Sequence, residues 1–508
     1  MSWSRYLPEA DGCVKRGVVV RRSAVLVGSP SGRVFGSGMA FVSYSYVYFL
    51  LGAVLLRWSA PRRAVPAVLL AAGTFFLWTF GSLGLALLLG AATIAFGTGL
   101  GMARRPNLRR PLVVGAVVLL VGNLGLFKYA DFLVRELRAL GALAGLPGLL
   151  PLPGLAPPVA ISFFTFQLVA YVVDVSRGAW PAERDFVRFL AYATFFPNVV
   201  SGPIVRPAEL LPQLARPASF DAERFSTSVF LFLGGAFKKV VLADSLAPAV
   251  GRVFDGAGPL TAPAAWIGAL AFAAQLYCDF SGYTDMARGA AGMLGFELPP
   301  NFRLPYLSTS IAEFWRRWHI SLSFWLRDYV YIPLGGSRRG RFRTYLNLLG
   351  TMALAGLWHG AAWTMVVWGL LHGALLALHR AFRDLVARRA GLARVRASRP
   401  WNVGGAVLTL LCVSLAWVFF RAPSLRAAGR VLRAMFTGPL AVDGLAEFRP
   451  ALVALAVVAA GHAVVVGDAP MRAYRALSPA LRGLLWAALI LALFWFAAPP
   501  AAFYYAMF

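Results

Sequence analysis

The sequence predicts an all-α polytopic membrane protein, and three observations lead to that class. Hydrophobic residues make up 59% of the 508 residues, and charged residues only 14%. Soluble domains carry about 25% charged residues, so a soluble fold of this length would lack polar surface, and the mean hydropathy of +0.68 agrees. From Met39 onward, apolar stretches of membrane-spanning length alternate with short loops rich in arginine or in proline and glycine.

Each apolar stretch is expected to be a helix that crosses or enters the bilayer, because backbone groups there must be hydrogen-bonded within the protein. The stretches are residues 40–56, 64–80, 83–103, 111–128, 157–175, 187–200, 226–248, 262–281, 345–358, 361–379, 403–420, 450–467 and 482–500. The segment 282–333 is aromatic but charged, so we expect re-entrant or interfacial helices there.

Basic residues outnumber acidic ones, with Lys+Arg 49 against Asp+Glu 21 and a net charge of +28. On a soluble protein this excess would indicate nucleic-acid binding. Here the arginines cluster between the apolar stretches, as the positive-inside rule predicts, so we expect no nucleic-acid partner. The loops that we place in the cytoplasm contain residues 57–63, 104–110, 338–343 and 380–399.

Residues 1–38 differ from the rest of the chain. They carry six basic residues and no long apolar run, whereas a secretory signal needs an uninterrupted apolar core of about 7–15 residues. We expect residues 1–38 to be a disordered leader. A start codon assigned too far upstream would explain its presence. We expect residues 39–508 to form a single transmembrane domain. The cysteines are too few and too scattered for a disulfide framework.

Histidines inside apolar spans are costly and suggest function by default, and this chain has five histidines. We expect no metal site, because His372 and His379 would lie about 10 Å apart along a helix, too far to bind one ion. His359 stands in Leu-Trp-His-Gly-Ala between two apolar runs. Without an anionic neighbour it would be neutral and able to act as a general base, or it would be a core histidine bonded to a backbone carbonyl.

His319 lies in the aromatic and basic segment 314–328. At helical spacing one face of this segment would carry Arg316, His319, Ser323 and Arg327. That strip would line a hydrated passage. Alternatively, the segment would be an interfacial amphipathic helix whose aromatic side chains lie at headgroup level.

Two carboxylates, Asp279 and Asp285, end the preceding apolar stretch. They fit either catalysis by paired carboxylates or an ion-pair network with Arg288, Arg316 or Arg317.

The loop Gly-Gly-Ser-Arg-Arg-Gly, residues 335–340, combines flexible backbone with guanidinium groups. Arg338 and Arg339, together with Arg341, could hold the phosphates of a nucleotide-bearing donor. Otherwise the loop only orients the neighbouring spans.

The segment from residue 275 to 380 contains several distinctive motifs. They are Asp-Phe-Ser-Gly-Tyr-Thr-Asp (279–285), Asn-Phe-Arg-Leu-Pro-Tyr (301–306), Glu-Phe-Trp-Arg-Arg-Trp-His (313–319), Tyr-Ile-Pro-Leu-Gly-Gly (331–336) and Leu-Trp-His-Gly-Ala (357–361). Together they resemble the membrane-bound O-acyltransferase (MBOAT) family. The Tyr-Ile-Pro-Leu-Gly-Gly loop followed by arginines is similar to the bacterial alginate O-acetyltransferase branch, whereas the teichoic-acid D-alanyl-transfer branch fits this loop less well.

The resemblance implies a ring of tilted transmembrane helices around a central tunnel, with the motif core at residues 275–380. It makes His359 the catalytic histidine at the narrow point of that tunnel and His319 a second functional histidine. The residues then expected to line the tunnel are Trp315, Trp318, Trp358, Asp279 and Asp285.

The implied reaction is acetyl transfer from a cytoplasmic thioester, acetyl-CoA, which is a cosubstrate and not a bound cofactor. A neutral His359 would deprotonate the acceptor hydroxyl. The resemblance also implies the bacterial cytoplasmic membrane, a partner of the SGNH type outside the cytoplasm and a polysaccharide as final acceptor. D-alanyl transfer to teichoic acid, or transport of a polysaccharide intermediate or acyl carrier without chemistry, are the alternatives.

Overall fold

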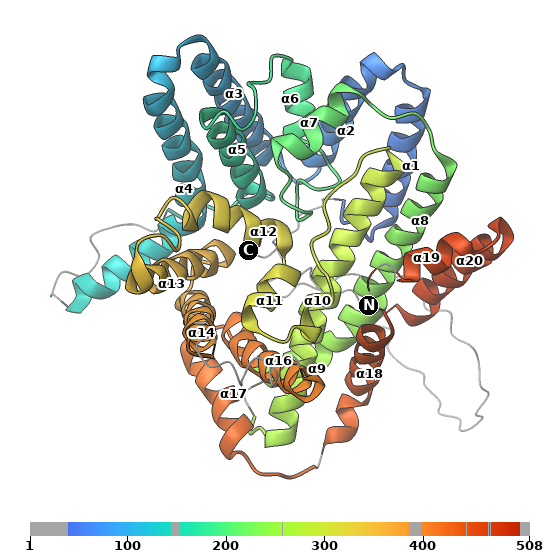
Figure 1. Cartoon of the computed structure of the whole chain (residues 1–508). Helices are drawn as coiled ribbons and strands as arrows, with labels where there is room; N and C mark the ends of the chain where they lie inside the picture. Colours follow the sequence, from blue (N-terminus) through green and yellow to red (C-terminus); the bar gives the residue numbers. More distant parts are fainter. Residues whose placement is uncertain are drawn as a thin grey trace, which may run out of the picture. The chain divides into compact units, whose positions relative to one another are not determined.

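The computed structural model describes residues 39–143, 153–256, 258–386, 398–442, 444–465, 467 and 469–497. Every regular element in these ranges is a helix (Figure 1). All of them belong to one compact unit, residues 37–508. The all-α prediction is therefore confirmed, whereas the prediction of a disordered leader falls outside the described residues.

Long helices are joined by short helical segments, and their bounds are as follows. The α-helices are α1 (Tyr44–Ser59), α2 (Val65–Trp78), α3 (Ser82–Arg104), α4 (Arg109–Leu143), α5 (Ile161–Ser176), α6 (Phe186–Ala193), α7 (Pro207–Ala215), α8 (Ala222–Phe237), α9 (Asp244–Phe254), α10 (Ala262–Met293), α11 (Ile311–Arg317), α12 (Ile320–Leu326), α13 (Gly340–His359), α14 (Trp363–Val386), α16 (Arg399–Arg421), α17 (Leu425–Thr437), α18 (Arg449–Val464), α19 (Ala469–Ala476) and α20 (Pro479–Phe496). The shorter segments are η1 (Arg62–Ala64), η2 (Pro106–Leu108), η3 (Lys238–Ala243), η4 (Pro305–Leu307), η5 (Arg327–Tyr331) and η6 (Leu445–Phe448), of which η3 and η5 are π-helical.

Six helical stretches in the described residues are long and apolar enough to cross a membrane. They are Ser82–Arg104, Pro106–Ala142, Trp363–Val386, Arg399–Arg421, Leu445–Val464 and Pro479–Phe496. Each of the other predicted stretches contains helix, but these helices are shorter, more buried or more polar. Several spanning helices are nevertheless present, so the protein is a membrane protein, as its composition predicts.

Two predicted boundaries are wrong. The stretch 187–200 contains only the short helix α6, and its second half is irregular backbone buried among other helices. The stretch 262–281 continues as helix to Met293, so the first residues of the expected re-entrant segment belong to α10. The charged residues of this extension remain within the helix because ion-pair partners inside the protein neutralise their side chains. The short helices η4, α11, α12 and η5 occupy the remainder of the 282–333 segment.

Helix α10 is buried along almost its whole length. It packs against α8, α9, α16, α17 and α18, and in Figure 1 it runs through the middle of these helices. Because protein and not lipid surrounds it, α10 tolerates acidic and basic residues that a lipid-facing helix would exclude. Helix α5 is similarly buried and packs against α3 and α4.

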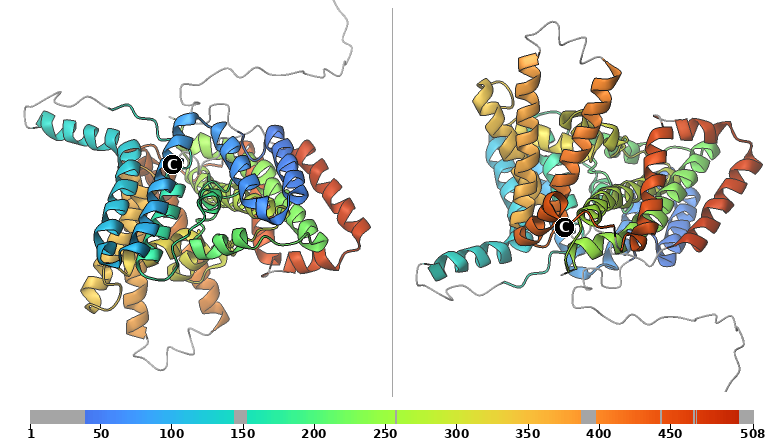
Figure 2. Two further views of the ribbon diagram at one scale, coloured as in Figure 1. Left: turned by 90° about the horizontal axis from the view of Figure 1, so that it is seen from above. Right: turned by 90° about the horizontal axis from the view of Figure 1, so that it is seen from below.

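Helices α13 and α14 approach each other closely near His359. A Cβ atom added to Gly356 would lie 2.1 Å from the carbonyl oxygen of Met365, and one added to Gly369 would lie 2.2 Å from that of Met352. Only glycine allows this backbone-to-backbone packing, a common device between membrane helices. Helix α14 in turn runs beside α16 (Figure 2).

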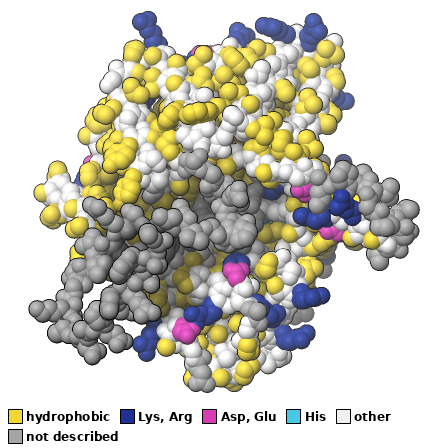
Figure 3. Space-filling model, turned by 180° about the vertical axis from the view of Figure 1, so that it is seen from behind, with side chains coloured by type: hydrophobic (Ala, Val, Ile, Leu, Met, Phe, Trp, Pro, Cys, Tyr) yellow, Lys and Arg dark blue, Asp and Glu magenta, His cyan; other side chains and the backbone are white. Residues whose placement is uncertain are grey.

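The described surface is largely apolar. Figure 3 shows hydrophobic side chains over much of one face, with lysines and arginines gathered toward its edges. Helix α20 has no buried residue in its 18-residue span, and many of its large side chains are exposed. An apolar exterior with basic margins is what lipid contact requires.

Candidate active site

The segment around His319 is not the continuous helix that spacing predicts. Helix α11 ends at Arg317, Trp318 is extended, and His319 adopts a left-handed backbone conformation with φ +42° before α12 begins at Ile320. This break turns His319 inward, where its exposed fraction is 0%. The expected polar strip with Arg316 therefore does not form, because Arg316 is exposed and His319 is buried.

Asn301 fixes the conformation after the break. Its Oδ1 accepts hydrogen bonds from the backbone N–H and the hydroxyl of Ser321, both at 3.0 Å, and lies 3.3 Å from Nδ1 of His319. Because the Ser321 N–H can only donate, the shared Asn301 atom is the carbonyl oxygen, which can only accept. Nδ1 of His319 must therefore carry the proton, so Nε2 is the basic nitrogen of the neutral ring.

His359 is the last residue of α13 and is 2% exposed. Its ring centroid lies 6.4 Å from that of His319, although 40 residues separate them in the chain. Aromatic rings surround the pair. Trp358 is 4.9 Å from His359 and 6.0 Å from His319. Other ring neighbours include Phe280 at 4.7 Å from His319, and Trp368 at 5.1 Å and Phe420 at 5.2 Å from His359.

The two histidines predicted from sequence are thus brought together in one buried enclosure of aromatic rings. A third histidine, His372, lies 4.9 Å from Trp368 and 5.2 Å from Trp315. Spacing along a helix gave His372 no role, because, apart from Trp368 of the same helix, its ring neighbours Trp315 and Trp417 come from α11 and α16. Among the described residues, no group of three or more His, Cys, Asp or Glu side chains is arranged to hold a metal ion.

The three tryptophans expected at the tunnel occupy different positions. Trp358 contacts both His319 and His359. Trp315 packs against His372 and Trp368, whereas Trp318 packs on Trp417 at 5.1 Å. All three are buried, and their role as tunnel lining stays a prediction.

Residues that the sequence analysis missed hold the end of α13 in place. Lys128 of α4 donates hydrogen bonds to the carbonyl oxygen of Trp358 and, at 3.2 Å, to the hydroxyl of Ser162. The neighbouring Tyr129 hydroxyl donates to the carbonyl of Leu357 at 2.8 Å. The last carbonyls of a helix lack intrahelical partners, so these two side chains satisfy the helix end that carries His359. Lys128 could have been singled out from the sequence, because a lysine inside an apolar stretch suggests a functional or structural role.

The acidic pair belongs to an ion-pair network. Asp279 lies 2.8 Å from Lys239, which also pairs with Asp244 at 2.7 Å. Asp285 pairs with Lys238 at 2.5 Å, with Arg288 at 3.6 Å beside it.

Of the arginines expected to pair with this acidic pair, Arg288 lies 3.6 Å from Asp285, whereas Arg317 pairs with Glu313 at 2.6 Å. The lysines come from the π-helical segment η3 between α8 and α9. Because η3 is remote from α10 in the chain, sequence spacing could not reveal them.

The loop arginines predicted to bind donor phosphates are exposed. Arg338, Arg339 and Arg341 lie at and just after the turn that precedes α13. Ser337 is held by Tyr331 at 3.0 Å and by Arg380 at 3.1 Å, and Asn347 donates to the carbonyl of Gly336 at 2.9 Å. The loop is therefore anchored to α13 and α14, and the three arginine side chains are exposed on it.

Comparison of the sequence with known proteins assigns the region around this site to a family. Residues 181–420 match the model of MBOAT, the membrane-bound O-acyltransferase family. That range includes both histidines and the whole motif core. With the relatives described next, the match shows that the chain belongs to this family and is an O-acyltransferase.

The relatives carry more specific names. The chain is 42% identical to the probable alginate O-acetylase AlgI of Azotobacter vinelandii over 404 residues, 78% of each chain. It is 35% identical to the peptidoglycan O-acetyltransferase of Helicobacter pylori over 414 residues, 76% of each chain. The teichoic acid D-alanyltransferase of Bacillus subtilis is 29% identical over 238 residues, 44% of this chain and 59% of the relative.

Proposed function

We propose that this protein moves an acetyl group from acetyl-CoA in the cytoplasm across the bacterial cytoplasmic membrane, for O-acetylation of a polysaccharide outside. The observation that supports this most is the enclosure of His359 and His319, whose ring centroids lie 6.4 Å apart. The Azotobacter vinelandii and Helicobacter pylori relatives, each similar over about three quarters of the chain, are named as O-acetylating enzymes.

In the proposed reaction, the neutral ring of His359 takes the proton of the acceptor hydroxyl. The hydroxyl oxygen attacks the thioester carbonyl, the carbon–sulfur bond breaks, and an oxygen ester forms. The CoA thiolate leaves and receives the proton from His359, so the histidine is regenerated. His319, with its basic Nε2 fixed by the Asn301 bond, orients one reactant by accepting a hydrogen bond.

The donor would approach from the side of the arginine loop. Arg338, Arg339 and Arg341 are exposed there, and guanidinium groups bind phosphates by paired hydrogen bonds. The acceptor would approach from the other side, where an extracytoplasmic partner of the SGNH type would take the acetyl group and pass it to the glycan.

The test uses purified protein in liposomes with acetyl-CoA labelled in the acetyl group. We expect label on the partner or glycan and release of free CoA thiol, and neither product with His359→Ala, while that variant still inserts in the membrane. Normal acetylation by His359→Ala would refute the assigned role. Label that crosses the membrane while still attached to CoA would instead indicate transport.

D-alanyl transfer is the second candidate, and the similarity to the teichoic acid D-alanyltransferase favours it. Supplying a D-alanyl carrier-protein thioester in place of acetyl-CoA separates the two. Product formed only with the D-alanyl thioester would replace the acetyl proposal.

A further inference from the structure

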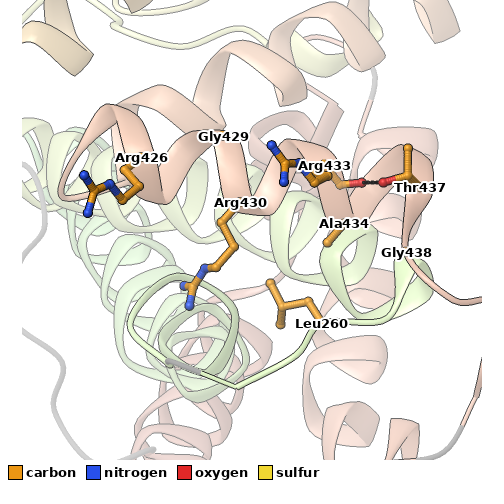
Figure 4. A pocket seen from close by; sticks show the side chains of 8 residues that line it. All are labelled: Leu260, Arg426, Gly429, Arg430, Arg433, Ala434, Thr437 and Gly438. Carbon is orange, nitrogen blue, oxygen red and sulfur yellow. Dashed lines mark hydrogen bonds between the residues drawn. The ribbon is translucent and has the colours of Figure 1, made fainter.

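Away from the histidines, a pocket of about 540 Å³ opens beside helix α17. Figure 4 shows its lining, in which three arginine side chains extend from one helix. Arg426, Arg430 and Arg433 are spaced at i, i+4 and i+7, so they lie on one face of α17. The other lining residues are Leu260, Gly429, Ala434, Thr437 and Gly438.

The pocket is strongly basic. Residues 421–442 contain no aspartate or glutamate, and in the described part of the chain no carboxylate forms an ion pair with Arg426, Arg430 or Arg433. Arg430 is directed inward, where it donates hydrogen bonds to the carbonyls of Gly256 and, at 3.3 Å, of Val253 at the end of α9. It therefore anchors α17 and adds positive charge to the floor, while Arg426 and Arg433 are exposed at the rim.

An apolar strip runs beside the arginine face. Leu425 is 46% exposed, Phe436 is 65% exposed, and Leu440 just beyond the helix is 83% exposed. The opposite face, with Ala428, Val431 and other small or apolar residues, is buried against the protein. A helix with one buried face, one arginine face and one exposed apolar strip is typical of an element lying in the membrane interface.

The positive-inside rule does not account for these arginines. It places residues 380–399 in the cytoplasm, and α16 begins at the end of that segment and is long enough to cross the membrane. Helix α17 starts four residues after α16 ends, so the same prediction places it at the opposite face. Arginines gathered there, with no acidic partners in their own segment, need another source of negative charge.

We propose that the α17 pocket binds the phosphate headgroup of an anionic membrane lipid. Arg426 and Arg433 hold the phosphate by charge-assisted hydrogen bonds, with the Arg430 charge behind them. The acyl chains lie along Leu425 and Phe436. This site is separate from the acyl-transfer histidines, so the lipid-binding proposal does not depend on the proposed reaction.

The experiment measures phosphatidylglycerol retained by the purified protein, by native mass spectrometry after extraction from nanodiscs of phosphatidylcholine with or without phosphatidylglycerol. Each arginine near an anionic surface contributes about a fivefold gain in binding. Arg426→Gln with Arg433→Gln should therefore weaken phosphatidylglycerol retention about 25-fold. Arg430 is left intact because it also anchors α9.

The matched control is Arg104→Gln with Arg472→Gln, which removes the same charge from two other exposed sites and should retain the lipid normally. Equal retention by the two double variants would overturn the proposal. So would displacement of phosphatidylglycerol by inorganic phosphate, by free CoA or by a soluble anionic polysaccharide at equal charge concentration, since each of these would identify the ligand as something other than a lipid.

Discussion

Lys128 donates a hydrogen bond to the carbonyl oxygen of Trp358, the residue immediately before His359. This bond links α4 to the end of α13 across 230 positions of the chain. The Lys128 ammonium also lies 5.6 Å from the centre of the Trp358 ring. A single side chain thus fixes both the backbone and the ring that adjoin the proposed base.

Lys128→Met should lower kcat about 10- to 100-fold and leave KM for the acyl donor nearly unchanged. A buried carbonyl that loses its hydrogen-bond donor costs about 1–3 kcal/mol, so the end of α13 should move and shift His359. Lys128→Arg, which keeps a donor, should recover part of kcat. Steady-state kinetics in detergent check both values.

Ser162→Ala is the control for Lys128, because it removes only the weaker partner at 3.2 Å and should keep most of the activity. A Lys128→Met enzyme with unchanged kcat would show that α13 holds His359 without α4.

His319 offers a way to separate function from folding. Its φ of +42° is costly for any residue with a Cβ atom, by about 1–2 kcal/mol, whereas glycine adopts it readily. His319→Gly should therefore be more stable than His319→Ala by about 1 kcal/mol, and both should lose most of the transfer activity. Thermal unfolding in detergent compares the stabilities. If both variants kept full activity, His319 would have only a structural role.

The sequence predicted those features whose signal is local. Apolar stretches revealed the helices, and the motifs that resemble the MBOAT family led to His319 and His359. It could not predict the break at Trp318, because helical periodicity runs through that position without proline or glycine to interrupt it. Nor could it pair Lys128 with Trp358 or Lys239 with Asp279, since these contacts join segments far apart in the chain and depend on how the helices pack.

Gly356 should not tolerate a methyl group. A Cβ atom there would lie 2.1 Å from the Met365 carbonyl oxygen, so Gly356→Ala must push α13 and α14 apart one turn from His359. We expect a loss of about 1–3 kcal/mol in stability and a clear loss of activity. Gly350→Ala on the same helix is the control, because nothing lies within 4 Å of its added Cβ atom. Equal effects of the two substitutions would contradict the close-packing argument.

The arginine loop makes a prediction about the donor. Replacing Arg338 and Arg339 by glutamine should raise KM for acetyl-CoA several-fold and leave kcat nearly unchanged, because these exposed groups would bind phosphates without touching the reacting atoms. Arg343→Gln is a control from the same exposed segment. An unchanged KM in the double variant would leave the loop with a topological role alone.

Lys239 should matter far more to stability than a surface cation. It is 5% exposed and lies between Asp244 and Asp279, so Lys239→Met leaves two buried carboxylates without their cation. Breaking a buried pair in this way costs about 3–5 kcal/mol. Glu223→Gln, which removes an exposed partner of Arg482, should cost about 0–1 kcal/mol. The free energy of unfolding checks both variants. A small effect of Lys239→Met would mean that water reaches Asp279, as a carboxylate facing a hydrated tunnel would require.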